Sequence, residues 1–242
     1  MLFCLIWIFV LLAGQAFLFP AAGISKSLSK PIIVVNPGHG GPDHGAQGSD
    51  GTLEKHITLT LTNLIIKNLE ADYQAISTRT GDYFITLADR AALANHNRAA
   101  LFLSIHAGGS FHYQTSGITI AYLDHDSFSQ DSVQGLAQDS APSYITWDQM
   151  QRDQFNKSAE AGKCIQKRLA GNRLFPKPRL SGLPLRVLSG ANMPALLIEI
   201  GYLTNPVEEK KLKDMDYLTK LAAEIANGID DFLSKSGKAT TP

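Results

Sequence analysis

The sequence is poor in cysteine and has no excess of charge of either sign. It contains two cysteines, Cys4 and Cys164, so it can build neither a framework of several disulfides nor a zinc site made of thiolates. Cys164 has no base among its sequence neighbours, and we expect it to pack on a helix face. Lysine plus arginine total 22, as do aspartate plus glutamate. With no net field to attract a polyanion, no nucleic-acid partner is expected.

One long hydrophobic run, residues 2–22, contains no charged residue. It is long enough for the apolar region of a signal peptide or for a membrane-spanning anchor. Small residues at Ala16 and from Ala21 to Gly23 offer cleavage sites, whereas the lack of Lys or Arg before the run is atypical of a signal. We therefore expect residues 1–25 to be a signal peptide or an N-terminal membrane anchor. The protein would be exported to the periplasm or cell envelope, or secreted, and would contact a membrane only if this segment is not cleaved.

Residues 26–237 show apolar segments alternating with amphipathic ones, which predicts an α/β fold with one domain. We expect a twisted, mostly parallel sheet of about six strands with helices on both faces. The expected strands are Ile32–Val35, Gln74–Thr78, Ala100–Ala107, Gly117–Leu123, Leu185–Leu188 and Ala195–Ile200. The expected helices are Leu53–Leu69, Leu87–Arg98, Trp147–Leu169 and Tyr217–Leu233. The polar segment Asp124–Pro142 is interpreted as a loop or insertion, with a role as a gate left open.

Four side chains with metal-binding or acid–base chemistry lie at element ends. His39, His106 and Glu199 lie at or just past the ends of apolar strands, and Glu54 begins a helix. In open α/β sheets, ligands bind beyond the carboxyl ends of the strands. Each residue has an ordinary explanation: a lone histidine is usually solvated, and the helix dipole favours Glu54. Glu199 is the exception, because its apolar neighbours make a carboxylate costly unless it is paired or bound to a metal. Their joint occurrence predicts one metal site.

The loop around His39 is rich in glycine, which lets a ligand approach the main chain. A phosphate-cradling loop is the competing interpretation. It is weak, because the segment PGHGGPDHG at residues 37–45 has neither the Lys-Ser/Thr pair nor the spaced dinucleotide fingerprint.

Five segments together resemble the zinc-dependent N-acetylmuramoyl-L-alanine amidases of bacterial cell-wall turnover. They are NPGHGGPDHGAQGSDGTLEK at 36–55, STRTGD at 77–82, LADRAALAN at 87–95, LFLSIHA at 101–107 and MPALLIEIGYLTNPVEE at 193–209. The resemblance covers Pro31 to Leu233. It implies one zinc ion bound by His39, Glu54 and His106, with Glu199 as the catalytic general base. The implied substrate is peptidoglycan, cleaved at the amide between the lactyl group of N-acetylmuramic acid and L-alanine, and a protein activator is left open.

Two other functions fit the same residues: a non-catalytic peptidoglycan-binding module of this fold, and a zinc peptidase that cuts within the stem peptide. The chain also departs from the family pattern. Asn36 stands where the family usually has Asp, and Gly108 and Gly109 stand where Asn usually follows the second histidine. If that aspartate orients a ligand, Asn36 would weaken or retune zinc binding.

Other residues are expected to be structural. Arg79 and Asp82 are interpreted as a pair that holds a turn. The remaining histidines are expected at the surface or in loops: His44, His56, His96, His112 and His125.

Overall fold

Six strands form one mixed sheet in the part of the chain that the computed structural model describes, residues 30–124 and 147–238. They are β1 (Ile32–Pro37), β2 (Gln74–Ser77), β3 (Leu101–Gly108), β4 (Thr119–Leu123), β5 (Arg179–Leu183) and β6 (Ala195–Tyr202). Their order is β2-β1-β3-β6-β4-β5. All neighbouring strands are parallel except β4 and β6, which are antiparallel. The predicted α/β domain with a mostly parallel sheet of about six strands is confirmed.

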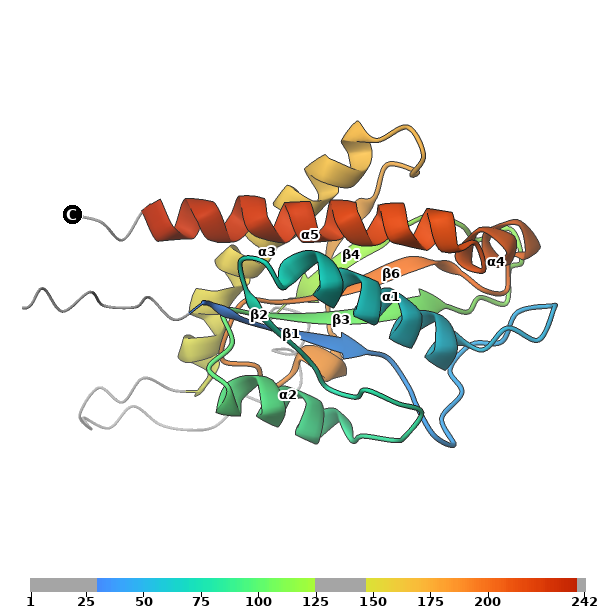
Figure 1. The fold of residues 1–242 in the computed structure, drawn as a ribbon. Helices are drawn as coiled ribbons and strands as arrows, with labels where there is room; N and C mark the ends of the chain where they lie inside the picture. Colours follow the sequence, from blue (N-terminus) through green and yellow to red (C-terminus); the bar gives the residue numbers. More distant parts are fainter. Residues whose placement is uncertain (1–29, 125–146, 239–242) are drawn as a thin grey trace, which may run out of the picture.

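Helices cover both faces of the sheet (Figure 1). On one face lie α1 (Glu54–Leu69), α3 (Trp147–Gly171) and α5 (Met215–Lys238). On the other lie α2 (Leu87–His96) and the 3-10 turn η1 (Arg186–Leu188). The short helix α4 (Pro206–Leu212) follows β6. None of the described helices is both long and apolar enough to span a bilayer.

The central strands are apolar on both faces because both faces are covered. In β3, Leu101, Leu103 and Ile105 join the core formed with α1, α3 and α5. Phe102, between them, joins the core formed with α2 and η1. Because β1, β3 and β6 are parallel neighbours, their carboxyl ends lie along one edge of the sheet. Side chains that follow these strands are therefore brought together at that edge.

The expected strand at Leu185–Leu188 is wrong. The fifth strand is β5, and residues 186–188 form one 3-10 turn in which the Leu188 N–H donates to Leu185 O at 3.1 Å. Pro184 has no N–H to donate to a sheet, and a segment of four residues, Leu-Arg-Val-Leu, is too short for its period to separate strand from turn. Val187 and Leu188 are buried all the same, because η1 packs on the core beside α2.

Several expectations lie outside the described residues. They are the export segment at 1–25, His125, and the segment 124–142 apart from Asp124. These stay predictions.

Candidate metal centre

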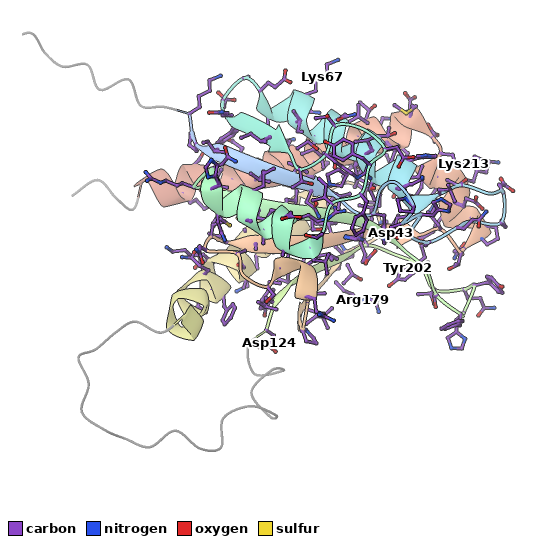
Figure 2. The ribbon with its side chains drawn as sticks, turned by 90° about the horizontal axis from the view of Figure 1, so that it is seen from below. Asp43, Lys67, Asp124, Arg179, Tyr202 and Lys213 are labelled. Atoms are coloured by element: carbon purple, nitrogen blue, oxygen red, sulfur yellow. The ribbon has the colours of Figure 1, made fainter. Side chains whose placement is uncertain are left out.

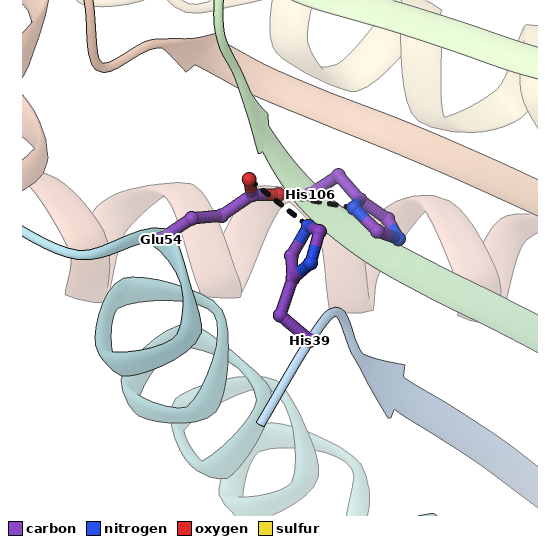
Figure 3. A group of neighbouring side chains, drawn as sticks. All are labelled: His39, Glu54 and His106. Carbon is purple, nitrogen blue, oxygen red and sulfur yellow. Dashed lines mark hydrogen bonds and ion pairs between the residues drawn. The ribbon is translucent and has the colours of Figure 1, made fainter. Parts of the chain in front are cut away.

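Three of the predicted side chains meet at the carboxyl edge of the sheet (Figure 3). His39 follows β1, His106 lies near the end of β3, and Glu54 is the first residue of α1. His39 Nε2 is 3.0 Å from Glu54 Oε2, and His106 Nδ1 is 3.0 Å from Glu54 Oε1. One ligand atom from each residue lies within 4.8 Å of the others. Two imidazoles and one carboxylate at this separation can hold a metal ion and leave a position open.

Asp43 orients the first histidine, a contact that was not predicted from the sequence. Its Oδ1 is 2.9 Å from His39 Nδ1 and also accepts from the Gly45 N–H at 3.2 Å. A carboxylate that accepts from Nδ1 keeps a proton on that nitrogen, so that Nε2 is the nitrogen available to bind a metal ion. Figure 2 shows Asp43 in the loop after β1, and Tyr202 at the end of β6. A histidine followed four residues later by aspartate in a glycine-rich loop was the only available sequence signal.

Glu54 is held as a buried anion. Beyond the two imidazoles, its oxygens accept from the Ala46 N–H at 2.8 Å and the Ala107 N–H at 2.9 Å. Burial alone would raise the pKa of Glu54, but the hydrogen bonds from His106 and His39 outweigh burial and lower the pKa to about 2. A charged carboxylate between two imidazoles is suited to bind a cation.

Glu199 lies beside this group, opposite His106 on the neighbouring strand β6. Burial raises the pKa of its carboxyl to about 7, and the charge of Glu54 adds to the rise while the imidazoles of His106 and His39 oppose it. Its Oε2 and the Nε2 of His106 are buried without a hydrogen-bond partner. Unsatisfied buried polar atoms are rare in folded proteins. Two of them beside a His/Glu/His group fit a site built to receive an ion and a reacting molecule.

Two buried arginines hold the main chain that carries His39. Arg79 donates to Gly38 O at 2.7 Å and to Lys55 O at 2.8 Å. Arg90 donates to Pro37 O at 2.7 Å and to His39 O at 2.9 Å. His39 has a φ of 60°, which is costly for a residue other than glycine, so these bonds stabilise a strained conformation.

Asp82 was predicted to pair with Arg79, and this is wrong. Asp82 pairs with Lys55 at 2.8 Å and accepts from the Gly41 N–H at 2.8 Å, so it fastens α1 to the glycine-rich loop. Arg79 instead donates hydrogen bonds to the buried main-chain carbonyl groups of Gly38 and Lys55. Both residues are structural, as predicted, but with different partners.

Asn36 does not hydrogen-bond to a ligand side chain. Its Oδ1 accepts from Arg90 and from Thr78, both at 2.7 Å, and its Nδ2 donates to Ser104 at 2.8 Å. The condition that this position orients a ligand by a direct hydrogen bond is therefore not met by Asn36, and its effect on zinc binding stays a prediction. Asn36 acts on the centre through Arg90 and the carbonyl groups that Arg90 holds.

Two glutamates of α4 fasten loops at the same edge. Glu209 is buried and accepts from Ser49 Oγ at 2.9 Å and from the Asp50 N–H at 3.1 Å, which holds the loop before Glu54. Glu208 accepts from the N–H groups of Gly117 and Tyr202, both at 2.8 Å. The segment NPVEE thus secures the chain on both sides of the centre.

The remaining predictions concern residues outside the group. His44, His56, His96 and His112 are exposed, as predicted. Cys164 is free and packs against the main core from α3, as predicted. At Gly108 an added Cβ would lie 3.0 Å from the Tyr202 ring and 3.3 Å from Glu199 Oε2, so glycine at this position lets both side chains approach the strand.

A methyl group at Gly45 is expected to disrupt the centre. It would lie 2.5 Å from Glu54 Oε2 and 2.6 Å from His39 Cδ2. Gly45→Ala should lower the affinity for a metal ion about 10-fold or more, measured by zinc titration. Gly51→Ala is the matched control, because Gly45 and Gly51 have similar φ values of 68° and 80° but nothing lies within 4 Å of an added Cβ at Gly51. Equal affinities in the two variants would contradict the geometry.

The fold and the centre define a class: single-domain α/β proteins with a His/Glu/His group at the carboxyl edge of the sheet. A family described as N-acetylmuramoyl-L-alanine amidase, Amidase_3, matches residues 33–231. This chain belongs to that family.

Relatives and solved structures agree with this assignment. The N-acetylmuramoyl-L-alanine amidase AmiA of Salmonella typhimurium is 32% identical over 223 residues, 84% of this chain and 76% of the relative. AmiC of Neisseria meningitidis is 30% identical over 233 residues, which are 90% of this chain but 56% of the relative. This chain thus spans little more than half of AmiC. The crystal structure of an N-acetylmuramoyl-L-alanine amidase from Clostridium difficile 630 has a TM-score of 0.71 and 27% identity, covering 86% of this chain and 100% of that one.

Proposed function

We propose that this protein is a zinc-dependent amidase of peptidoglycan. It would cleave the amide bond between the lactyl group of N-acetylmuramic acid and the L-alanine of the stem peptide. The observation that carries the proposal is the convergence of His39, Glu54 and His106 on one point, with the buried carboxyl of Glu199 beside it. Family membership supports the bond and the substrate.

Each residue has one role in the proposed reaction. His39, Glu54 and His106 would hold one zinc ion. When bound, zinc polarises the scissile carbonyl and lowers the pKa of a water molecule. Glu199 takes a proton from the attacking water molecule as the water oxygen forms a bond to the carbonyl carbon. The same carboxyl returns the proton to the L-alanine nitrogen as the C–N bond breaks. A carboxyl with a pKa of about 7 is suited to both steps.

A cavity beside the centre offers room for part of the substrate. It has a volume of about 200 Å³ and is lined by His39 and His106 together with apolar side chains that include Phe84, Leu87 and Val187. A group of the substrate next to the scissile bond would occupy it.

The partners and location belong to the same proposal. A protein partner is consistent with a related structure, the CwlD amidase from Clostridioides difficile in complex with the GerS lipoprotein, which has a TM-score of 0.67, 25% identity, and covers 85% of this chain and 100% of that one. Export by residues 2–22 would bring the enzyme to the cell envelope, where the polymer lies.

Removal and return of the metal tests the proposal. The purified protein should release stem peptides from isolated peptidoglycan, lose this activity after dialysis against a chelator, and regain it with one equivalent of zinc. Activity unchanged by thorough chelation would contradict the proposal. Binding to peptidoglycan without any cleavage by the zinc-loaded protein would instead support a non-catalytic binding module.

A further inference from the structure

The exposed aromatic side chains of the described chain are confined to two loops. Tyr83 and Phe84, in the β2–α2 loop, are 46% and 53% exposed. Phe111 and Tyr113, in the β3–β4 loop, are 102% and 71% exposed. Apart from these four, the Phe and Tyr side chains whose burial the structure describes are buried or half-buried. Exposed aromatic rings gathered in this way mark an interaction surface.

The two loops flank the metal centre. The β2–α2 loop packs on the glycine-rich loop that carries His39, since a Cβ at Gly41 would lie 2.9 Å from the Phe84 nitrogen, and Phe84 lines the cavity beside His39. The β3–β4 loop starts three residues after His106, at Gly109. A Cβ added at Gly109 of this loop would lie 3.2 Å from the Cβ of Ala46, whose N–H donates to Glu54.

The β3–β4 loop holds its aromatic tip in a fixed shape. Ser110 Oγ and Thr115 Oγ1 are 2.8 Å apart, and the Thr115 N–H donates to His112 O at 2.9 Å. The base is tied to the segment after β6, because the Ser110 N–H donates to Thr204 Oγ1 at 3.0 Å. Phe111 and Tyr113 therefore project from an ordered turn, and binding through them costs little loop entropy.

The chemistry of this tip fits a neutral, amphipathic ligand. Residues 108–118 contain no Asp, Glu, Lys or Arg. A membrane surface with anionic lipids attracts Lys and Arg, which are missing here. A sugar ring presents an apolar C–H face that stacks on an aromatic ring, with hydroxyl groups at its edge for Tyr and His to bond.

We propose that Phe111 and Tyr113, with Tyr83 and Phe84 on the other side of the centre, bind the sugar rings of a glycan strand. This inference rests on the proposed function in one respect: an enzyme that removes a peptide branch from within a polymer must accommodate the polymer on both sides of the scissile bond. Aromatic side chains on both sides of the centre supply two such contacts. They would hold the enzyme on the wall through its own catalytic surface.

A double variant tests the proposal. Phe111→Ala/Tyr113→Ala is compared with Leu174→Ala/Leu183→Ala, which removes two other exposed apolar side chains, 44% and 39% exposed. Leu183 is the last residue of β5. Because β5 is parallel to β4, and β4 is antiparallel to β6, Leu183 lies at the edge of the sheet opposite the centre. Binding to glycan strands freed of their peptides is measured by co-sedimentation, in a Glu199→Gln background. The Phe111/Tyr113 variant should bind about 10-fold more weakly than its parent, and the control within about 2-fold.

A second measurement separates binding from catalysis. With Glu199 restored, KM for polymeric peptidoglycan should rise about 10-fold in the Phe111/Tyr113 variant while kcat stays within about 2-fold, and KM for a small soluble muramyl peptide should rise less. Unchanged glycan binding would overturn the proposal. The proposal would also be overturned if the variant lost binding only to anionic lipid vesicles, or only to glycan strands that retain their peptides. Failure of the proposed function would look different: the parent would cleave neither substrate, whatever the outcome of the sedimentation comparison.

Discussion

Replacing Glu199 with glutamine is expected to abolish turnover while zinc binding is retained. Loss of a positioned general base lowers kcat by about 100- to 10,000-fold. Glutamine keeps the shape of the side chain but cannot take a proton from water. Because Glu199 stands beside the three proposed ligands and is not one of them, metal content should stay at one ion per chain. Steady-state kinetics on a muramyl peptide and elemental analysis of the same preparation measure both quantities.

His39→Ala is the complementary variant. It removes one of the three proposed ligands, so zinc content and activity should fall together. The two variants therefore separate the chemical step from metal binding. A zinc-free Glu199→Gln protein with full activity would contradict both role assignments.

Replacing Arg79 with methionine is expected to lower the free energy of unfolding more than any other substitution considered for this protein. The guanidinium is fully buried and donates to Gly38 O, Lys55 O and Gly81 O at 2.7, 2.8 and 3.0 Å. Methionine fills much of the volume but removes these three hydrogen bonds, leaving Gly38 O and Lys55 O with the weaker donor Thr58 Oγ1 at 3.0 and 3.3 Å. At about 1 kcal/mol for each lost hydrogen bond, the free energy of unfolding should fall by roughly 3 kcal/mol. Urea unfolding of the metal-free protein measures this.

Arg168→Met provides the control for Arg79→Met. Arg168 makes a two-bond ion pair with Asp231 at 2.6 and 2.7 Å, but both side chains are partly exposed and lie between α3 and α5. An exposed pair contributes about 1 kcal/mol or less. Equal losses in the two variants would show that Arg79 does not hold the loop at the metal centre.

The sequence predicted the centre because its chemistry lies at element ends. Because β1, β3 and β6 are apolar on both faces, the sequence predicts that they lie in a parallel sheet covered on both sides. The carboxyl ends of such strands lie at one edge, so His39, His106 and Glu199 are predicted to lie together there. The prediction failed where the local pattern was ambiguous. Residues 186–188 of the expected strand form a 3-10 turn, whereas β5 is a half-buried edge strand with little apolar character.

The supporting contacts could not be predicted, because they join residues far apart in sequence. Arg90 reaches Asn36 across 54 positions, and Glu209 reaches Ser49 across 160. Such partners depend on how α2 and α4 pack, which no local period encodes. Asn36 illustrates the point: the sequence marks it as unusual, but only the structure shows that its partner is an arginine.

The most direct test of the account combines zinc analysis with mass spectrometry of a peptidoglycan digest. The account predicts one zinc ion per chain and the release of intact stem peptides that begin with a free L-alanine amine. Peptides cut at an internal bond would identify a peptidase instead. A zinc-loaded protein that releases no peptide, or full release by a protein without zinc, would contradict the central claim.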